Sequence, residues 1–188
     1  DFQIPHLRIL VVIYYLSLRR IFHETSETRP RGSCASLATQ TAPPRVTRKI
    51  QVRLNPLDRG NMGKPCFDWS IIPLSKQFEK QIIKIDEFEL FCISMGNPHA
   101  VIFFKDLNEL NKIDIEKIGI KIQKSDIFPE SVNVEFATIL EDKTIRMKVW
   151  ERGAGRTLAC GSGACATLVA ANQQNLSLRK NDIILDGG

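Results

Sequence analysis

The 188-residue sequence predicts an α+β fold in which a sheet surrounds one buried helix. After Gly163 the run ACATLVAANQQN is small and apolar around most of a helical circumference, as expected of a helix without a solvent face. Apolar and polar residues alternate over 132–140 and 143–150, with Glu-Asp-Lys joining the two segments at hairpin length. Strands that enclose a single helix place the chain in the α+β class.

The remaining elements follow from turn signals and short apolar runs. Gly63, Pro65 and Pro73 mark turns in the segment that begins at Asn61. Leu107 to Gln123 is rich in Ile and Lys and predicts one or two helices, with Asp106 or Asn108 as the cap. The expected strands are, in order, 88–92, the buried run 100–104, the two hairpin strands, and a last strand at 182–188.

Charge divides the chain near residue 60. Residues 1–60 hold 10 Lys and Arg against 4 Asp and Glu, a net of +6, whereas residues 61–188 hold 16 against 17, a net of −1. The first segment has nine Arg and one Lys, and residues 19–60 within it lack helical or strand periodicity. We predict an atypical, arginine-rich segment at 1–60 and a folded domain at 61–188. The first segment is open to three interpretations: a disordered basic arm, a targeting segment, or an out-of-frame translation.

Membrane insertion and nucleic-acid binding are not expected. The apolar run Ile9–Leu18 has about half of the roughly 20 residues that a spanning helix needs, so it is expected to form a buried strand or helix. No aromatic residues interleave with the arginines from Arg29 to Arg59, as they would on a nucleic-acid surface.

The five cysteines indicate a reducing, cytoplasmic location, because their number is odd and their spacing irregular. Cys160 and Cys165 would point about 140° apart on a helix, which disfavours a shared zinc. No other cysteine or histidine pair supplies the missing ligands, so no metal is expected. Cys66, Cys92 and Cys165 are interpreted as small core residues.

The stretch VWERGAGRTLACGSGACATLVAA contains the main candidate site. A helix that begins near Gly161 would direct unpaired backbone amides and a positive dipole end at an anion such as a carboxylate. Cys160 would lie at this helix N-terminus, where the pKa of a thiol falls below its usual value of about 8.5. Glu151 and Arg152 precede it on a glycine hinge that suits a charged or zwitterionic ligand.

Two further groups of polar residues accompany this turn. The sequence GNPHAVIF holds Asn97 and His99 at the end of a strand, although a lone histidine is more often structural than functional. Asn133 alternates with apolar Val132 and Val134, and by itself it would be an exposed strand residue.

Taken together, NMGKP, MGNPHAVIF, FPESVNVEFA and VWERGAGRTLACGSGACA resemble diaminopimelate epimerase, in that order, over about residues 61–188. The resemblance implies a mixed or antiparallel sheet wrapped around a central helix. It also implies epimerisation of LL- and meso-diaminopimelate without pyridoxal phosphate or any other cofactor. In that reaction a thiolate removes the α-proton and a thiol delivers one to the opposite face. The family works in lysine and peptidoglycan-precursor biosynthesis on a small-molecule substrate and usually as a homodimer.

The resemblance also assigns roles to individual positions. The residues implied to be catalytic are Cys160, His99 and Glu151. The residues implied to bind substrate are Asn97, Asn133, Glu151, Arg152, Gly161 and Ser162. Ser162 stands where threonine is commoner, a change that keeps the hydroxyl.

The sequence departs from the family in two regions. Residues 1–60 contain no match to the first cysteine motif, M-C-G-N-G-x-R-C, and Cys34 in RGSCASL lacks its Gly-Asn-Gly flank. The closing strand that follows the final Gly-Gly in the family is also expected to be missing. Three functions are therefore open: an epimerase, a catalytically inactive amino-acid-binding fragment, and a redox-active thiol protein that uses Cys160 alone.

Overall fold

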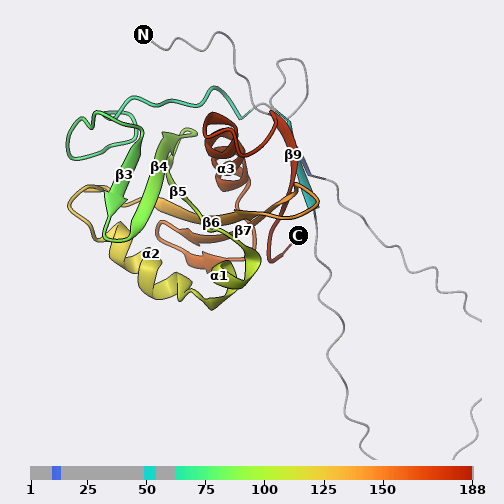
Figure 1. The fold of residues 1–188 in the computed structure, drawn as a ribbon. Coiled ribbons are helices and arrows are strands. Elements are labelled where there is room, and N and C mark those ends of the chain that lie inside the picture. Colours follow the sequence, from blue (N-terminus) through green and yellow to red (C-terminus); the bar gives the residue numbers. More distant parts are fainter. Residues whose placement is uncertain (1–9, 14–48, 54–61, 188) are drawn as a thin grey trace, which may run out of the picture.

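A computed structural model describes residues 10–13, 49–53 and 62–187 (Figure 1). Its strands are β1 (Leu10–Ile13), β2 (Lys49–Arg53), β3 (Ile82–Ile85), β4 (Phe88–Ser94), β5 (Pro98–Phe103), β6 (Asn133–Ile139), β7 (Ile145–Glu151), β8 (Gly155–Thr157) and β9 (Lys180–Ile184). Its helices are α1 (Leu107–Lys112), α2 (Ile115–Gln123) and α3 (Gly161–Gln173).

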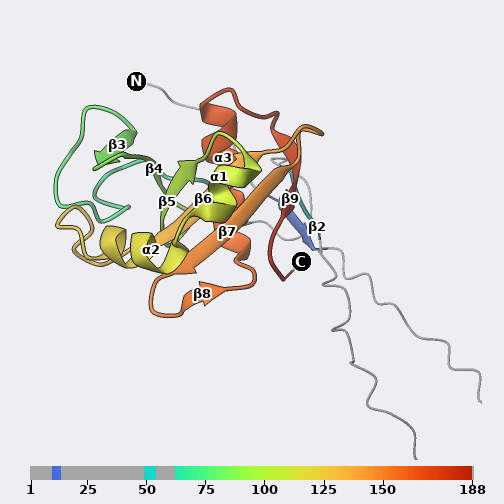
Figure 2. The ribbon, with the colours of Figure 1, turned by 60° about the horizontal axis from the view of Figure 1, so that its bottom comes forward.

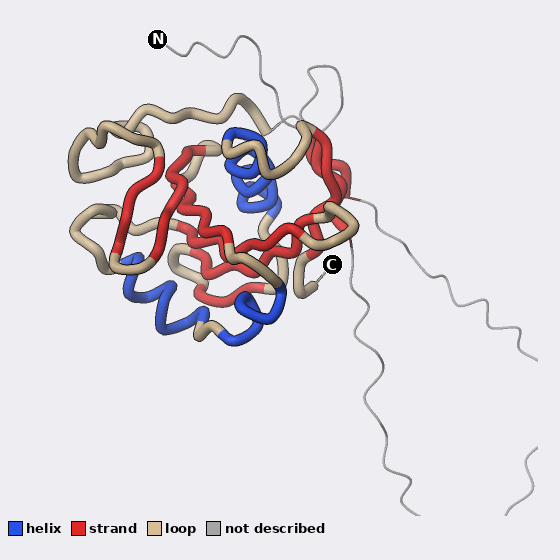
Figure 3. Tube along the Cα trace, viewed as in Figure 1, coloured by secondary structure: helices blue, strands red, loops and turns tan. Residues whose placement is uncertain are grey.

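The described strands form one mixed sheet in the order β1-β2-β9-β7-β6-β5-β4-β3, with β8 attached to β7. The pairs β5–β6 and β7–β9 are parallel and the other pairs are antiparallel. The sheet curves around α3, while α1 and α2 cover its outer face (Figures 1 and 3). The predicted α+β class with one enclosed helix is confirmed.

Helix α3 is buried because nearly every one of its side chains is small or apolar. Its residues from Gly163 to Ala171 are all buried, and they form one hydrophobic core with the inner face of the sheet. A second core lies between the outer face and the two short helices, where Phe136, Leu110 and Ile122 are fully buried. Strand β6 thus packs on both faces, which keeps its side chains in fixed positions.

The segment 107–123 folds as two helices, each with an aspartate cap. The Asp106 carboxylate accepts from the backbone N–H of Glu109, and the Asp114 carboxylate accepts from that of Lys117. The cap of the first helix is therefore Asp106 and not Asn108. Each cap satisfies one of the N–H groups that a helix start leaves unpaired.

Other predicted elements have different limits in the structure. The last strand is Lys180–Ile184 and not 182–188, because Asp186 leaves the ladder to pair with Arg146 and Arg156. Strands β3 and β8, of four and three residues, were not predicted. Figure 2 shows β8 folding back from β7 at the edge of the sheet.

Two pieces of the arginine-rich segment are described. Residues 10–13, within the predicted strand or helix Ile9–Leu18, form β1, and residues 49–53 form β2 against β9. The rest of 1–60, including Cys34, lies outside the described residues, so the predicted division of the chain stays a prediction. Among the described residues, no helix is long and apolar enough to cross a membrane.

Candidate functional site

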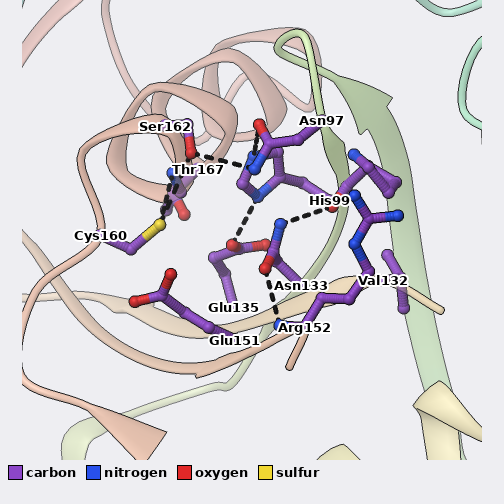
Figure 4. Close-up of polar contacts among 12 residues, drawn as sticks. Asn97, His99, Val132, Asn133, Glu135, Glu151, Arg152, Cys160, Ser162 and Thr167 are labelled. Atoms are coloured by element: carbon purple, nitrogen blue, oxygen red, sulfur yellow. Dashed lines mark hydrogen bonds and ion pairs between the residues drawn. The ribbon is translucent and has the colours of Figure 1, made fainter. Parts of the chain in front are cut away.

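The candidate site lies where the N-terminus of α3 meets β5, β6 and β7 (Figure 4). The parallel pairing of β5 with β6 sets His99 opposite Asn133, and β7 follows as the next strand of the sheet. Residues far apart in the sequence, such as Asn97 and Ser162, which are 65 positions apart, are thereby within hydrogen-bonding distance. The structure brings together the predicted site residues except for the guanidinium of Arg152.

Cys160 is the N-cap of α3, as predicted. Its backbone is extended, at φ −138° and ψ 112°, and its Sγ accepts from the N–H of Gly163 at 3.3 Å. The Ser162 hydroxyl lies 3.6 Å from the same sulfur. The thiol is buried and yet has two donors that would stabilise a thiolate.

The two glycines of this turn have different reasons to be glycine. A Cβ on Gly161 would meet nothing within 4 Å, so the backbone there is open to a ligand. A Cβ on Gly163 would lie 2.7 Å from Glu135 Oε1 and 3.2 Å from Cys160 Sγ. The first glycine leaves room in front of the helix, and the second allows the helix to approach β6.

A chain of hydrogen bonds runs from β6 to the thiol through His99 (Figure 4). The Nδ1 of His99 is 2.7 Å from Glu135 Oε1, and its Nε2 is 2.9 Å from Asn97 Oδ1. The Asn97 amide donates to Ser162 Oγ at 3.4 Å, and this hydroxyl is the one beside Cys160. His99 is fully buried and connects a carboxylate with the helix start.

Asn133 fixes the backbone on both sides of its strand. Its amide donates to the carbonyl of Pro98 at 2.9 Å, and its Oδ1 accepts from the backbone N–H of Arg152 at 2.8 Å. The expectation that its pattern alone suggested, an exposed strand residue, is wrong, because its side chain is only 4% exposed. Both faces of β6 are covered, so alternation along this strand does not separate inside from outside.

The two charged residues of the glycine hinge point to different places. The Glu151 carboxylate accepts from the Thr157 hydroxyl and lies below Cys160 in Figure 4. The Arg152 guanidinium donates to the carbonyl of Glu130 at 3.1 Å and lies on the opposite side of the group from the thiol. Glu151 faces the site, while Arg152 contributes its backbone N–H.

The electrostatic environment of Cys160 differs from the one predicted. Burial, together with the charge of Glu135, raises the pKa of the Cys160 thiol to about 11. The hydrogen bonds from Ser162 and Gly163 act in the opposite direction and are weaker, and Glu151 adds a smaller upward contribution. The predicted low pKa is wrong, because desolvation and a neighbouring carboxylate outweigh the helix N-terminus.

Comparison with known proteins agrees with the family resemblance that the sequence motifs indicated. The sequence model of the family described as diaminopimelate epimerase matches residues 91–188, slightly more than half of the chain. The chain belongs to the diaminopimelate epimerase family.

Curated diaminopimelate epimerases share 41–52% identity with this family member. The protein of Acetivibrio thermocellus is 43% identical over 133 residues, which cover 68% of this chain and 46% of the relative. That of Acidiphilium cryptum is 41% identical over 169 residues, with 84% and 60% covered. That of Bacteroides thetaiotaomicron is 52% identical over 101 residues, with 54% and 37% covered. The chain spans about half the length of the curated relatives that it matches.

A solved structure is also similar. It is a probable proline racemase from Agrobacterium radiobacter K84 with bound carbonate, at 17% identity and a TM-score of 0.38, covering 69% of this chain and 39% of that one. This similarity is too low for a comparison of the two sites.

The other described cysteines of this diaminopimelate epimerase family member are not in the site. Cys92 and Cys165 are fully buried, and burial raises the pKa of both thiols, that of Cys165 to about 12. Cys66 is half-buried, and its backbone pairs with Ser94. The core interpretation is confirmed for Cys92 and Cys165 and holds only in part for Cys66. Within the described residues, no three His, Cys, Asp or Glu side chains converge as a metal site would require.

Glu135 is the site residue that sequence reasoning missed. It is fully buried, it contacts His99, and it lies across from Gly163. One signal was available: Glu135 is two positions after Asn133 on a strand, so both side chains share a face. A carboxylate that shares a strand face with a predicted substrate-binding residue is itself a candidate site residue.

Proposed function

We propose that this site supplies one half of an amino-acid epimerase centre that interconverts LL- and meso-diaminopimelate without pyridoxal phosphate. The observation that carries the proposal is the placement of the Cys160 thiol at the N-cap of α3, beside open backbone at Gly161. A thiol that can carry a proton and open backbone that could bind a carboxylate would then lie side by side. Epimerisation next to a carboxylate needs both.

The substrate carboxylate would bind at the start of α3. The N–H groups of Gly161 and Ser162 have no acceptor within the helix, and the helix dipole favours a negative charge in front of them. The absence of a side chain at Gly161 allows close approach. Donors held in this position also stabilise the charge that spreads onto the carboxylate when the α-proton leaves.

Cys160 would exchange a proton with the α-carbon. In one direction its thiolate takes the α-proton, so that the C–H bond breaks and an S–H bond forms. In the other direction its thiol gives a proton to the carbanion. Inversion then needs a second acid or base on the opposite face of that carbon.

The surrounding polar residues would orient these groups. His99 and Asn97 hold the Ser162 hydroxyl towards the sulfur. The half-buried Glu151 carboxylate suits the substrate ammonium group and is also near the thiol. Asn133 positions the 151–152 backbone.

Proton exchange in deuterated water tests the proposal. The purified chain is incubated with LL-diaminopimelate in D₂O while α-deuterium uptake and the meso isomer are followed, with Cys160→Ser as the control. Uptake that is lost in the variant is the expected result, and meso product would show that a second acid or base completes the centre. Uptake without inversion would identify a one-base half-site, and no uptake would contradict the proposal.

A second candidate is an amino-acid-binding fragment without catalysis. Two observations favour it: the raised pKa of Cys160, and the full burial of Cys92 and Cys165 in the core. Such a fragment would bind diaminopimelate and protect Cys160 from alkylation, yet show no deuterium uptake. The epimerase predicts protection and uptake together.

A further inference from the structure

Glu135 is a buried carboxylate with an incomplete set of partners. Its side chain is fully inaccessible, and Oε1 is 2.7 Å from His99 Nδ1. Its other oxygen, Oε2, is buried and has no hydrogen-bond partner among the residues that the structure describes. A carboxylate inside a protein needs several donors to disperse its charge. The partner that the structure gives Glu135 is His99, and the charge of Glu135 raises the pKa of the neighbouring Cys160 thiol.

Cys160 is such a neighbour. The position that a Cβ on Gly163 would occupy is 2.7 Å from Glu135 Oε1 and 3.2 Å from Cys160 Sγ. The oxygen and the sulfur are therefore at most 5.9 Å apart, the sum of the two distances. Only the hydrogen of Gly163 occupies that position. A like charge at this separation acts strongly against ionisation of the thiol.

The other charged groups around the sulfur do not cancel this effect. From β5, His99 contacts Glu135 directly and reaches the thiol only through Asn97 and Ser162. The charge of Glu135 still raises the pKa of the Cys160 thiol. From β7, Glu151 adds negative charge, and within α3 the nearby Cys165 is an un-ionised core thiol. The Gly163 N–H and the Ser162 hydroxyl favour a thiolate, but both are neutral donors.

We propose that Glu135 is a positioning residue that keeps the proton on Cys160 in the empty site, so that Cys160 meets the substrate as the acid of the exchange. The catalytic part of this inference, that Cys160 acts as the acid, rests on the proposed function. The carbanion's electron pair takes the proton from sulfur, so that a C–H bond forms as the S–H bond breaks. The two neutral donors then hold the resulting thiolate.

Site-resolved alkylation of Cys160 tests the role of Glu135. Iodoacetamide modification is measured by peptide mass spectrometry between pH 7 and 11 for the native chain, Glu135→Gln and Glu151→Gln. Removing a unit charge at this separation raises the thiolate fraction about tenfold below the pKa. Because a less basic thiolate is less nucleophilic, we expect alkylation of Glu135→Gln at pH 8 to be about threefold faster. The Glu151→Gln control should change it less.

An unchanged or slower rate in folded Glu135→Gln would overturn the proposal, as would a larger effect of Glu151→Gln. Circular dichroism and the thermal midpoint show whether the variant folds. The native chain provides a test that needs no variant, because the pKa of Cys160 is raised to about 11 and its alkylation should still be rising at the top of this pH range. The same peptide in urea should titrate at the ordinary value of a thiol, and equal midpoints would overturn the proposal.

These measurements need no substrate. A failure of the proposed function leaves the alkylation profile as expected, whereas a failure of the Glu135 proposal changes the profile and leaves deuterium uptake intact. The conservative variant Glu135→Asp separates charge from packing. It retains the charge and should keep alkylation slow, whereas a packing effect would change Glu135→Asp and leave the isosteric Glu135→Gln like the native chain.

Discussion

Cys160 experiences opposing influences, and their balance decides its chemistry. Burial and the carboxylates of Glu135 and Glu151 favour the thiol, while Ser162 and Gly163 donate to the sulfur and favour the thiolate. A helix N-terminus is usually associated with a reactive, low-pKa cysteine. Here the helix N-terminus limits the rise in the pKa of Cys160 and does not bring that pKa below its usual value. The pKa of this thiol therefore depends on several neighbours, and each of them can be substituted separately.

Removal of the Ser162 hydroxyl should make Cys160 less reactive. Ser162→Ala loses a donor to the thiolate, and one such hydrogen bond contributes about 0.5–1 kcal/mol. The pKa of Cys160 should rise further, but because the more basic thiolate is also more nucleophilic, alkylation at pH 8 should be only about 1.5 to 2 times slower. Ser162→Thr keeps the hydroxyl and is the matched control. Equal rates in the alanine and threonine variants would contradict the contact.

Gly163 and Gly161 should respond differently to alanine. Gly163→Ala places a methyl group 2.7 Å from Glu135 Oε1, so we expect a loss of about 1–3 kcal/mol in the free energy of unfolding. Gly161→Ala meets nothing within 4 Å and should be neutral or stabilising by up to about 1 kcal/mol. Urea denaturation measures both. A neutral Gly163→Ala would show that α3 does not press against β6.

At the scale of the elements, pairing between distant strands assembles the site. The parallel register of β5 and β6 places His99 beside Asn133, and β7 brings Glu151 to the same edge. Helices α1 and α2 form the connection that a parallel pair requires, and they cover the outer face. Their caps therefore stabilise the link between the two strands that carry the histidine and Glu135.

The cap of α2 should be measurable by substitution. Asp114→Ala removes the acceptor of the Lys117 N–H and should cost about 1 kcal/mol of unfolding free energy. Asp114→Asn keeps an oxygen acceptor and should retain most of that stability. Thermal or urea unfolding compares the two. An equal loss in both variants would mean that charge, and not the cap hydrogen bond, matters here.

At the scale of the whole molecule, the end of the chain returns to the site. After β9, Asp186 pairs with Arg146 of β7 and with Arg156 of β8. The N–H of Gly187 then donates to the carbonyl of Leu158 at 2.7 Å, two residues before Cys160. This tail joins three strands to the turn that precedes α3. Its stability should depend on the ionisation of Asp186.

Burial alone would raise the pKa of Asp186, but its hydrogen bonds and charge interactions with Arg156 and Arg146 hold it below its usual range. A carboxyl whose pKa is lower in the folded than in the unfolded state stabilises the fold above about pH 4. That stability is lost as the pH falls through the folded pKa. Asp186→Asn should therefore cost about 1 kcal/mol at pH 7.

The difference between the native chain and Asp186→Asn should disappear as the pH falls well below 4, as measured by urea unfolding between pH 3 and 7. The exposed Asp126 provides the control, since Asp126→Asn should change stability little at either end of this range. A difference that is independent of pH would show that the aspartate acts through shape and not through charge.

The sequence by itself determined the local features of this protein. Small apolar residues predicted the buried α3, the glycines predicted its start at Gly161, and the motif around Cys160 indicated the family. Periodicity, caps and turns act over a few residues and can therefore be read from the chain. The hairpin of β6 and β7 was predicted for the same reason.

Only the tertiary structure decided the state of the site. Glu135 is a site residue because β6 is covered on both faces, and the raised pKa of Cys160 follows from burial and from that carboxylate. The end of β9 depends on the pairing of Asp186 with Arg146 and Arg156, and the direction of the Arg152 side chain depends on the carbonyl of Glu130; these partners are remote in the sequence. Desolvation and charge act between neighbours in space, so sequence spacing alone could not show them.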